Sequence, residues 1–77
     1  MTLIEFLHYH TKVGELCVIK NEGWIVTTCW IDNEDLFMIP ETLRDKQVIN
    51  ERWGQLPIVN QQGVQIKIPC HYIIIQF

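Results

Sequence analysis

Several residue types and patterns that identify a function are missing from this 77-residue chain. It has no serine, the most common hydroxyl nucleophile. It also has no Cys-x2-4-Cys or His-x3-5-His pair of the kind that marks a zinc site. Its four glycines are isolated, so no GxGxxG or Walker loop is present: Gly14, Gly23, Gly54 and Gly63. We therefore expect no enzymatic activity and no cofactor.

Charged residues are also scarce, at 19% of the chain, and the net charge is −3. The six basic residues are scattered, whereas binding to nucleic acid needs them clustered against phosphates. No apolar run is longer than the four residues of Tyr72–Ile75, far fewer than the roughly 20 residues of a membrane span. Residues 1–10 lack the basic start of a signal peptide. We expect a soluble cytoplasmic protein that binds neither nucleic acid nor membrane.

The three cysteines are an odd number without the spacing of a disulfide framework: Cys17, Cys29 and Cys70. This pattern favours free thiols in a reducing compartment. A metal site could still form in space around the adjacent Cys70 and His71. On a strand, however, these two side chains face opposite sides, and the helical spacing of His8 and His10 separates their rings by about 200°. We therefore predict no metal.

Length and composition favour a single domain over residues 1–77 that binds another chain. A domain this short buries only about 60% of the surface that its unfolded chain exposes, so its own core gives marginal stability. Hydrophobic residues nevertheless make up 48% of the sequence, at the upper end of ordinary usage. A second copy or a protein partner would cover the apolar surface that remains.

The N-terminal residues predict a short helix. Thr2 and Glu5 have the spacing of a capping box, in which each side chain satisfies a backbone N–H of the first turn. An apolar face is expected from the i, i+3, i+4, i+7 spacing of four residues: Leu3, Phe6, Leu7 and His10. About three turns are expected, ended by Gly14. Such a helix must pack on a sheet, since it is too short to be stable alone.

Residues 15–31 predict a β-hairpin closed by a three-residue loop with Gly23 in the left-handed conformation. This register pairs Lys20 with Trp24 and makes Cys17 and Cys29 diagonal neighbours, whereas a disulfide needs direct opposition. Neither face of this hairpin is polar. We expect the helix to cover one face, and folded-over strands or a second subunit to cover the other.

Further short strands are expected up to the C-terminus: Leu36–Ile39, Val48–Trp53, Leu56–Val59, Val64–Ile68 and Cys70–Phe77. A single turn of helix is expected at Glu41–Asp45. The last strand has no side-chain charge over residues 73–77 and must lie centrally or in an interface to avoid aggregation. The predicted fold is α+β: the helix packs on a curved, mainly antiparallel sheet of five or six strands, which would form a small open barrel if it rolled up.

Aromatic residues are numerous for this length, with three tryptophans, two tyrosines and three phenylalanines. Core packing accounts for part of them. Trp24 follows the predicted turn and Trp53 precedes Gly54, so each is expected at a strand end where its side chain protrudes. Tryptophan, tyrosine and arginine dominate binding hot spots. We predict a protein-contact surface made by four residues: Trp53, Arg52, Trp24 and Tyr72.

The opening residues Met1–Leu7 (MTLIEFL), followed by a hairpin and alternating strands, resemble the layout of small uncharacterised accessory proteins of phages and mobile elements. The local motif of this resemblance is the Thr-Leu-x-Glu-Phe/Leu-Leu start. It implies a protein that binds and modulates a host protein, anti-defence inhibitors being one such class. It implies no functional residues.

Our prediction is a small non-enzymatic protein-binding module that forms a homodimer and recognises a protein through an apolar sheet face or a strand edge. Two alternatives belong to other classes. One is a small barrel that stacks the bases of single-stranded nucleic acid on tryptophan and tyrosine. The other is a small metal-binding protein with cysteine and histidine ligands.

Overall fold

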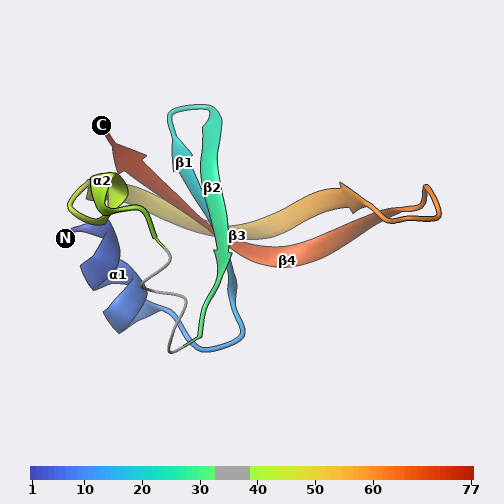
Figure 1. The fold of residues 1–77 in the computed structure, drawn as a ribbon, viewed down its shortest axis with the longest axis horizontal. Helices are drawn as coiled ribbons and strands as arrows, with labels where there is room; N and C mark the ends of the chain where they lie inside the picture. Colours follow the sequence, from blue (N-terminus) through green and yellow to red (C-terminus); the bar gives the residue numbers. More distant parts are fainter. Residues whose placement is uncertain (33–38) are drawn as a thin grey trace.

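The computed structural model describes residues 1–32 and 39–77 (Figure 1). Its elements, in chain order, are α1 (Leu3–His10), β1 (Leu16–Asn21), β2 (Trp24–Trp30), α2 (Glu41–Arg44), β3 (Gln47–Val59) and β4 (Gln65–Gln76). The strands form one sheet in the order β2-β1-β4-β3. The outer pairs are antiparallel, and the central pair, β1 with β4, is parallel.

The α+β class is therefore correct, but the strand number and the barrel are wrong. Within the described residues the sheet has four strands and stays open, with β2 and β3 as its edges. Fewer strands form because two predicted breaks do not occur. Both β3 and β4 run on where the sequence suggested an end, at Gly54 and at Pro69. Residues 36–38 of the predicted strand Leu36–Ile39 lie outside the described part of the chain.

Both prolines in the long strands occupy positions where the missing N–H costs no ladder bond. Pro57 lies on the edge strand β3, opposite Lys67. Pro69 lies in β4 before the segment that pairs with β1, which starts only at His71. No described strand pairs with the outer side of β3 at Pro57, and β1 does not reach Pro69 on the other side of β4. The missing N–H therefore costs no hydrogen bond at either proline, and the ladder between β3 and β4 continues through both residues.

Helix α1 begins as the sequence predicts. The Thr2 Oγ1 accepts a hydrogen bond from the Glu5 N–H, and Glu5 Oε1 accepts from the Thr2 N–H at 3.2 Å, which completes the capping box. The Thr2 hydroxyl also donates to Glu5 Oε1, which lowers the pKa of that carboxyl group. The helix ends at His10, earlier than expected, and His10 is exposed.

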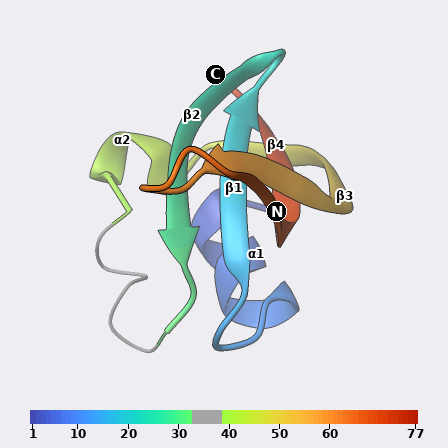
Figure 2. The same ribbon diagram turned by 90° about the vertical axis from the view of Figure 1, so that its right-hand side faces the viewer.

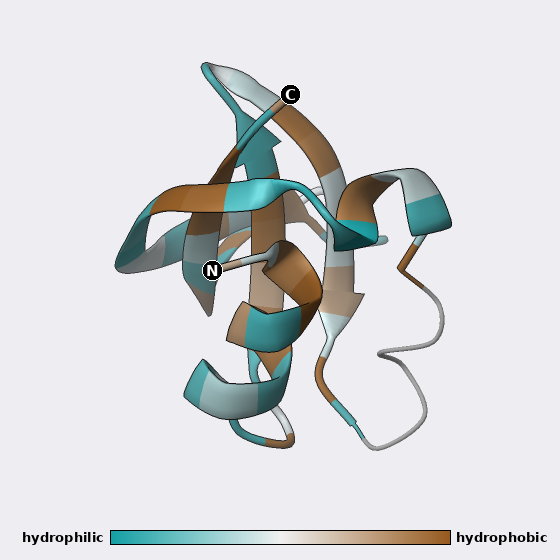
Figure 3. Cartoon of the chain, turned by 90° about the vertical axis from the view of Figure 1, so that its left-hand side faces the viewer, coloured by the Kyte–Doolittle hydropathy of each residue, from teal (hydrophilic) through white to brown (hydrophobic). Residues whose placement is uncertain are grey.

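The helices α1 and α2 lie on the same side of the sheet, as Figures 1 and 2 show. Their apolar residues are buried with the inner side chains of the strands in one core: Leu3, Phe6, Leu7, Cys17, Ile19, Ile31, Ile39, Leu43, Ile73 and Ile75. Figure 3 views this side of the molecule and shows α1 in front of the strands, with apolar and polar residues alternating along the helix. No helix of the described residues is both long and apolar enough to cross a membrane.

The apolar segment near the C-terminus lies centrally, as the sequence required. Strand β4 runs between β1 and β3, and both Ile73 and Ile75 have no exposed surface. Their backbone groups pair on both sides, so this segment offers no edge to another molecule.

The second face of the sheet has a smaller core. Leu16, Val18 and Cys70 are buried there, with Leu56, Ile68 and Tyr72 packed against them. The last two residues before the β3–β4 turn, Ile58 and Val59, extend beyond this cluster and are exposed. The β3–β4 hairpin therefore projects away from the helices as a two-stranded arm, shown in Figure 1.

The register of the β1–β2 hairpin differs from the predicted one. Asn21 pairs with Trp24, so the loop has two residues, and Glu22, with φ 56°, takes the left-handed conformation that was assigned to Gly23. A bulge at Ile19/Lys20 then shifts the pairing once more. The two changes together move each partner by two positions, so Cys17 lies directly opposite Cys29 and not diagonal to it.

The strained turn residue gives a test of this register. Positive φ costs most L-residues about 1 kcal/mol, and it costs asparagine less. We therefore expect Glu22→Asn to raise the free energy of unfolding by about 0.5 kcal/mol. Urea denaturation would measure it. Glu22→Ala, which keeps the strain, should give no increase, and equal effects of the two substitutions would contradict the observed turn.

Candidate functional site

Four side chains form one row across the whole sheet. Cys29 on β2 lies opposite Cys17 on β1, Cys17 pairs with His71 on β4, and His71 lies opposite Trp53 on β3. Directly paired residues point to the same face of a sheet. For this row it is the face covered by α1, because the ring of Phe6 lies edge-on to His71 at 5.6 Å.

His71 is the centre of this row and is a buried polar residue, with 2% of its surface exposed. The Trp53 ring stacks on it at 4.3 Å between centroids and an angle of 14°. On its outer side, His71 Nε2 lies 2.7 Å from Glu51 Oε2, a short hydrogen bond to a half-exposed carboxylate. Together with the edge-on contact of Phe6, these two contacts fix the position and the plane of the imidazole.

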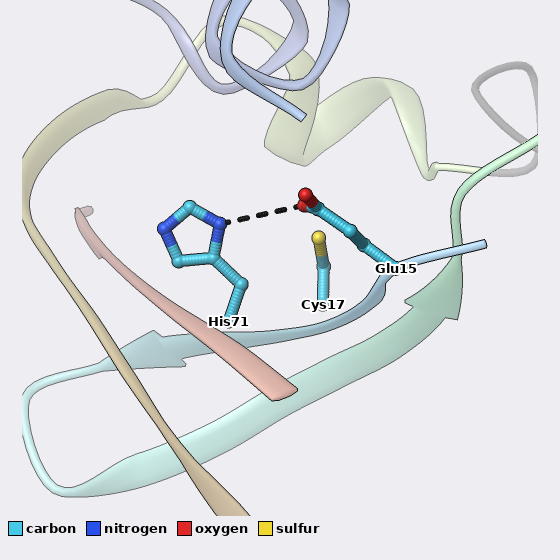
Figure 4. A group of neighbouring side chains, drawn as sticks. All are labelled: Glu15, Cys17 and His71. Carbon is cyan, nitrogen blue, oxygen red and sulfur yellow. Dashed lines mark ion pairs between the residues drawn. The ribbon is translucent and has the colours of Figure 1, made fainter. Parts of the chain in front are cut away.

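The other ring nitrogen of His71 faces a second carboxylate. Nδ1 lies 3.7 Å from Glu15 Oε2, as the dashed line in Figure 4 shows. This is too long for a hydrogen bond. Both atoms are buried and neither has a hydrogen-bond partner. A buried unsatisfied polar atom costs about 1–3 kcal/mol, so this pair is an unusual local feature.

Cys17 completes the cluster. In Figure 4 its sulfur lies just below the Glu15 carboxylate, and both lie to the right of the His71 ring. The Sγ of Cys17, a carboxylate oxygen of Glu15 and a ring nitrogen of His71 all lie within 4.8 Å of one another. Burial, and then the neighbouring Cys29 and Glu15, raise the pKa of the Cys17 thiol to about 12. The thiol is therefore protonated and a poor nucleophile at neutral pH.

The residues predicted to form one contact surface are divided among different parts of the sheet. Trp24 begins the edge strand β2 and is 78% exposed, whereas Trp53 lies on the opposite edge strand β3. Arg52 and Trp53 are neighbours in the chain, so their side chains point to opposite faces. Trp53 stacks on His71, and Arg52 lies over the ring of Tyr72 at 5.1 Å.

Arg52 and Tyr72 do form a local unit on the face away from α1. The Tyr72 hydroxyl donates to the Gln55 carbonyl at 3.1 Å, and Lys20 Nζ lies 5.5 Å from the ring on the β1 side. A side chain at position 54 would collide with this ring, since a Cβ there would lie 2.7 Å from Tyr72 Cε2. Gly54 is thus needed for close packing of the tyrosine and does not mark a turn.

The edge strand β2 combines exposed apolar side chains with an absence of charge. Trp24, Ile25, Val26 and Trp30 are all exposed, and residues 24–30 include no charged side chain and no proline. Soluble proteins usually protect an edge strand with charges, proline or a covering element. The edge strand β3 follows that rule, since it carries Glu51, Arg52 and Pro57.

Comparison with known proteins gives no relative: no family model, no curated protein and no solved structure matches this chain. Assignments of function therefore depend on the geometry alone.

Cys17 and His71 are recognisable as separate candidates from the sequence, whereas Glu15 and Glu51 are not. Their carboxylates are recognisable only when β1 lies beside β4 and β3 lies on its other side. The prediction that Cys70 and His71 face opposite sides is confirmed, because Cys70 is buried in the core of the other face. His8 and His10 are exposed on α1 and lie outside the cluster.

The raised pKa of Cys17 predicts a loss of stability in alkaline solution. Above pH 9.0, the ordinary value, the unfolded chain releases the thiol proton, whereas the native chain keeps it up to about pH 12. The unfolded state then binds fewer protons, so the free energy of unfolding falls with rising pH, by at most about 1.4 kcal/mol per pH unit.

We expect Cys17→Val to remove this contribution when unfolding in chelator-treated buffer is followed by circular dichroism between neutral and alkaline pH. The half-buried Cys29 supplies the control, Cys29→Val, which should keep most of the wild-type slope. Parallel slopes for the wild type and Cys17→Val would show that this thiol ionises normally.

Proposed function

We propose that this chain is a small non-enzymatic protein-binding module, and that the free edge of β2 is its contact surface. The single observation that supports this most directly is the uncharged, exposed edge from Trp24 to Trp30. A partner that adds an extended strand there would satisfy the outward backbone groups and cover these apolar side chains.

Aromatic anchors flank the proposed contact. Trp24 lies at one end of β2 and is 78% exposed, and Trp30 lies at the other and is 53% exposed. Backbone pairing along the strand gives affinity, and pockets for alternate side chains give specificity. In this proposal Trp24 remains a contact residue. Trp53, Arg52 and Tyr72 belong to other surfaces, where they stabilise His71 or pack against each other.

The same edge suits a homodimer. Two copies of β2 can pair antiparallel about a two-fold axis, because an isologous contact uses one patch on both subunits. Such pairing extends the sheet across the dimer and removes both free β2 edges. We propose this homodimer as the form of the protein without its partner.

The absence of enzymatic activity remains a proposal, and two features support it. The thiol nearest to a histidine, Cys17, is buried and protonated, whereas a catalytic cysteine needs an accessible thiolate. A surface hollow of about 320 Å³ is present elsewhere, between the β1–β2 turn and the C-terminus, with Glu22 as the ionisable residue of its lining. A hollow with so few functional groups suits a contact better than catalysis.

A cytoplasmic location is part of the same proposal. It is supported by three cysteines that form no disulfide, two of which, Cys17 and Cys29, lie directly opposite each other. That the bound protein is a host protein modulated by a phage or mobile element stays a prediction based on the resemblance of the N-terminal residues.

The test is a charge placed on the proposed edge. We expect Ile25→Lys to convert a dimer into a monomer in light scattering, and to abolish capture of a partner from a bacterial lysate, because lysine on an edge strand opposes strand addition. Ile49→Lys is the matched control: Ile49 lies on the other edge strand and is 58% exposed, compared with 52% for Ile25.

The expected result is that Ile49→Lys keeps the mass and the captured protein of the wild type. A wild-type chain that is monomeric and captures no protein would contradict the proposal. So would equal behaviour of the two lysine variants, which would show that the contact does not involve β2. Binding of oligonucleotides at low salt would instead favour the nucleic-acid alternative.

A further inference from the structure

The buried cluster beneath α1 contains the donor atoms of a metal site. It brings together a thiol, an imidazole nitrogen and a carboxylate oxygen, from Cys17, His71 and Glu15, within 4.8 Å of one another. These are the three donor types that bind zinc in proteins. Two of the residues lie on adjacent strands, β1 and β4, and the third directly precedes β1.

We propose that Glu15, Cys17 and His71 bind a zinc ion, with His71 coordinating through Nδ1. The first argument is that the two polar atoms have no other role. His71 Nδ1 and Glu15 Oε2 are both buried, and neither has a hydrogen-bond partner. An ion between them would bind both atoms at once, and no described protein group forms a hydrogen bond to either atom.

The second argument is the distance between these atoms. In a tetrahedral zinc site with Zn–N and Zn–O bonds of about 2.1 Å, two such ligand atoms are about 3.4 Å apart. His71 Nδ1 and Glu15 Oε2 are 3.7 Å apart, which is too long for a hydrogen bond and close to this ligand spacing. Three protein donors occupy three of the four positions of a tetrahedral zinc site, and a water molecule can complete the coordination.

The third argument is the position of Glu51. A histidine that binds a metal generally donates its other ring N–H to a carboxylate or carbonyl, which fixes its tautomer and its orientation. His71 Nε2 lies 2.7 Å from Glu51 Oε2, and in the tautomer that donates there the lone pair of Nδ1 is directed towards Glu15. Glu51 is thus a positioning residue, and stacking on Trp53 holds the ring plane.

Charge also favours a divalent cation. The site holds the carboxylate of Glu15 and, one contact away, that of Glu51, while the imidazole is neutral when it binds a metal. Coordination would convert the Cys17 thiol to a thiolate and release its proton to the solvent. The Glu15 carboxylate and the Cys17 thiolate would then neutralise the charge of Zn²⁺ in a buried environment.

Cobalt(II) is the probe, because it replaces zinc and gives a visible spectrum. We expect chelator-treated wild-type protein to bind one equivalent of Co²⁺, with a sulfur-to-cobalt charge-transfer band and the intense visible bands of tetrahedral coordination. Added Zn²⁺ should displace the cobalt and bleach the spectrum. Cys17→Ala should abolish the charge-transfer band, whereas Cys70→Ala, which removes the thiol of the opposite face, should retain it.

Two carboxylate variants test the geometry in a way that does not depend on the buried thiol. Glu51→Gln should weaken the affinity for zinc about 10- to 100-fold, the usual effect of removing the carboxylate partner of a ligand histidine. Glu41→Gln makes the same charge change on the exposed surface of α2 and should leave the affinity unaltered. If Cys17→Ala does not fold, Glu15→Gln replaces it and must also lower the affinity for zinc.

The proposal is overturned if wild-type protein shows no sulfur-to-cobalt band, or if the band survives Cys17→Ala. It is also overturned if Glu51→Gln and Glu41→Gln bind zinc equally. In those cases the cluster binds no metal, and Glu51 only orients the ring of His71. None of these outcomes bears on the β2 edge, so the proposed function is tested separately.

Discussion

The parallel pairing of β1 with β4 is the contact on which the rest of this structure depends. It joins two hairpins that are separate in the sequence, with Cys17 beside His71 at one end and Asn21 beside Ile75 at the other. Because β3 occupies the other side of β4, the uncharged segment around Ile73 is paired on both sides and buried. Parallel pairing needs a long connection. Here the chain between β1 and β4 includes β2, α2 and β3.

This pairing also determines the difference between the two faces of the sheet. The inner face is covered by α1 and α2 and holds the larger core, together with the polar cluster around His71. The outer face has a small core at the base of the arm, sealed by Tyr72. A sheet with apolar residues on both faces is stable only if both are covered. In this molecule one cover is a helical layer and the other is the curved hairpin itself.

The polar cluster and the β2 edge are two different departures from an ordinary small domain. The cluster places two unsatisfied polar atoms in the core, where each is costly, and a bound cation would offset that cost. The edge exposes tryptophan and isoleucine on a strand without protecting charges, and pairing with another strand would cover them. The row Cys29, Cys17, His71 and Trp53 links them, since it runs from the β2 edge to the opposite edge of the sheet.

Local chemistry in the sequence determined the capping box at Thr2, the burial of Leu3, Phe6 and Leu7 on α1, the presence of a hairpin over residues 15–31 and the burial of Ile73 and Ile75. Each of these depends on neighbours a few residues apart or on the solubility of a single segment. Only the tertiary structure decided the number of strands, the direct opposition of Cys17 and Cys29, and the meeting of Glu15, His71 and Glu51. Strand β4 continues through Pro69 because β1 pairs with β4 only from His71 on, and β3 continues through Gly54 because the ring of Tyr72 fills the space that a side chain there would take. Which residues of separate hairpins meet is fixed by long-range register, and that register leaves no periodic signal in the chain.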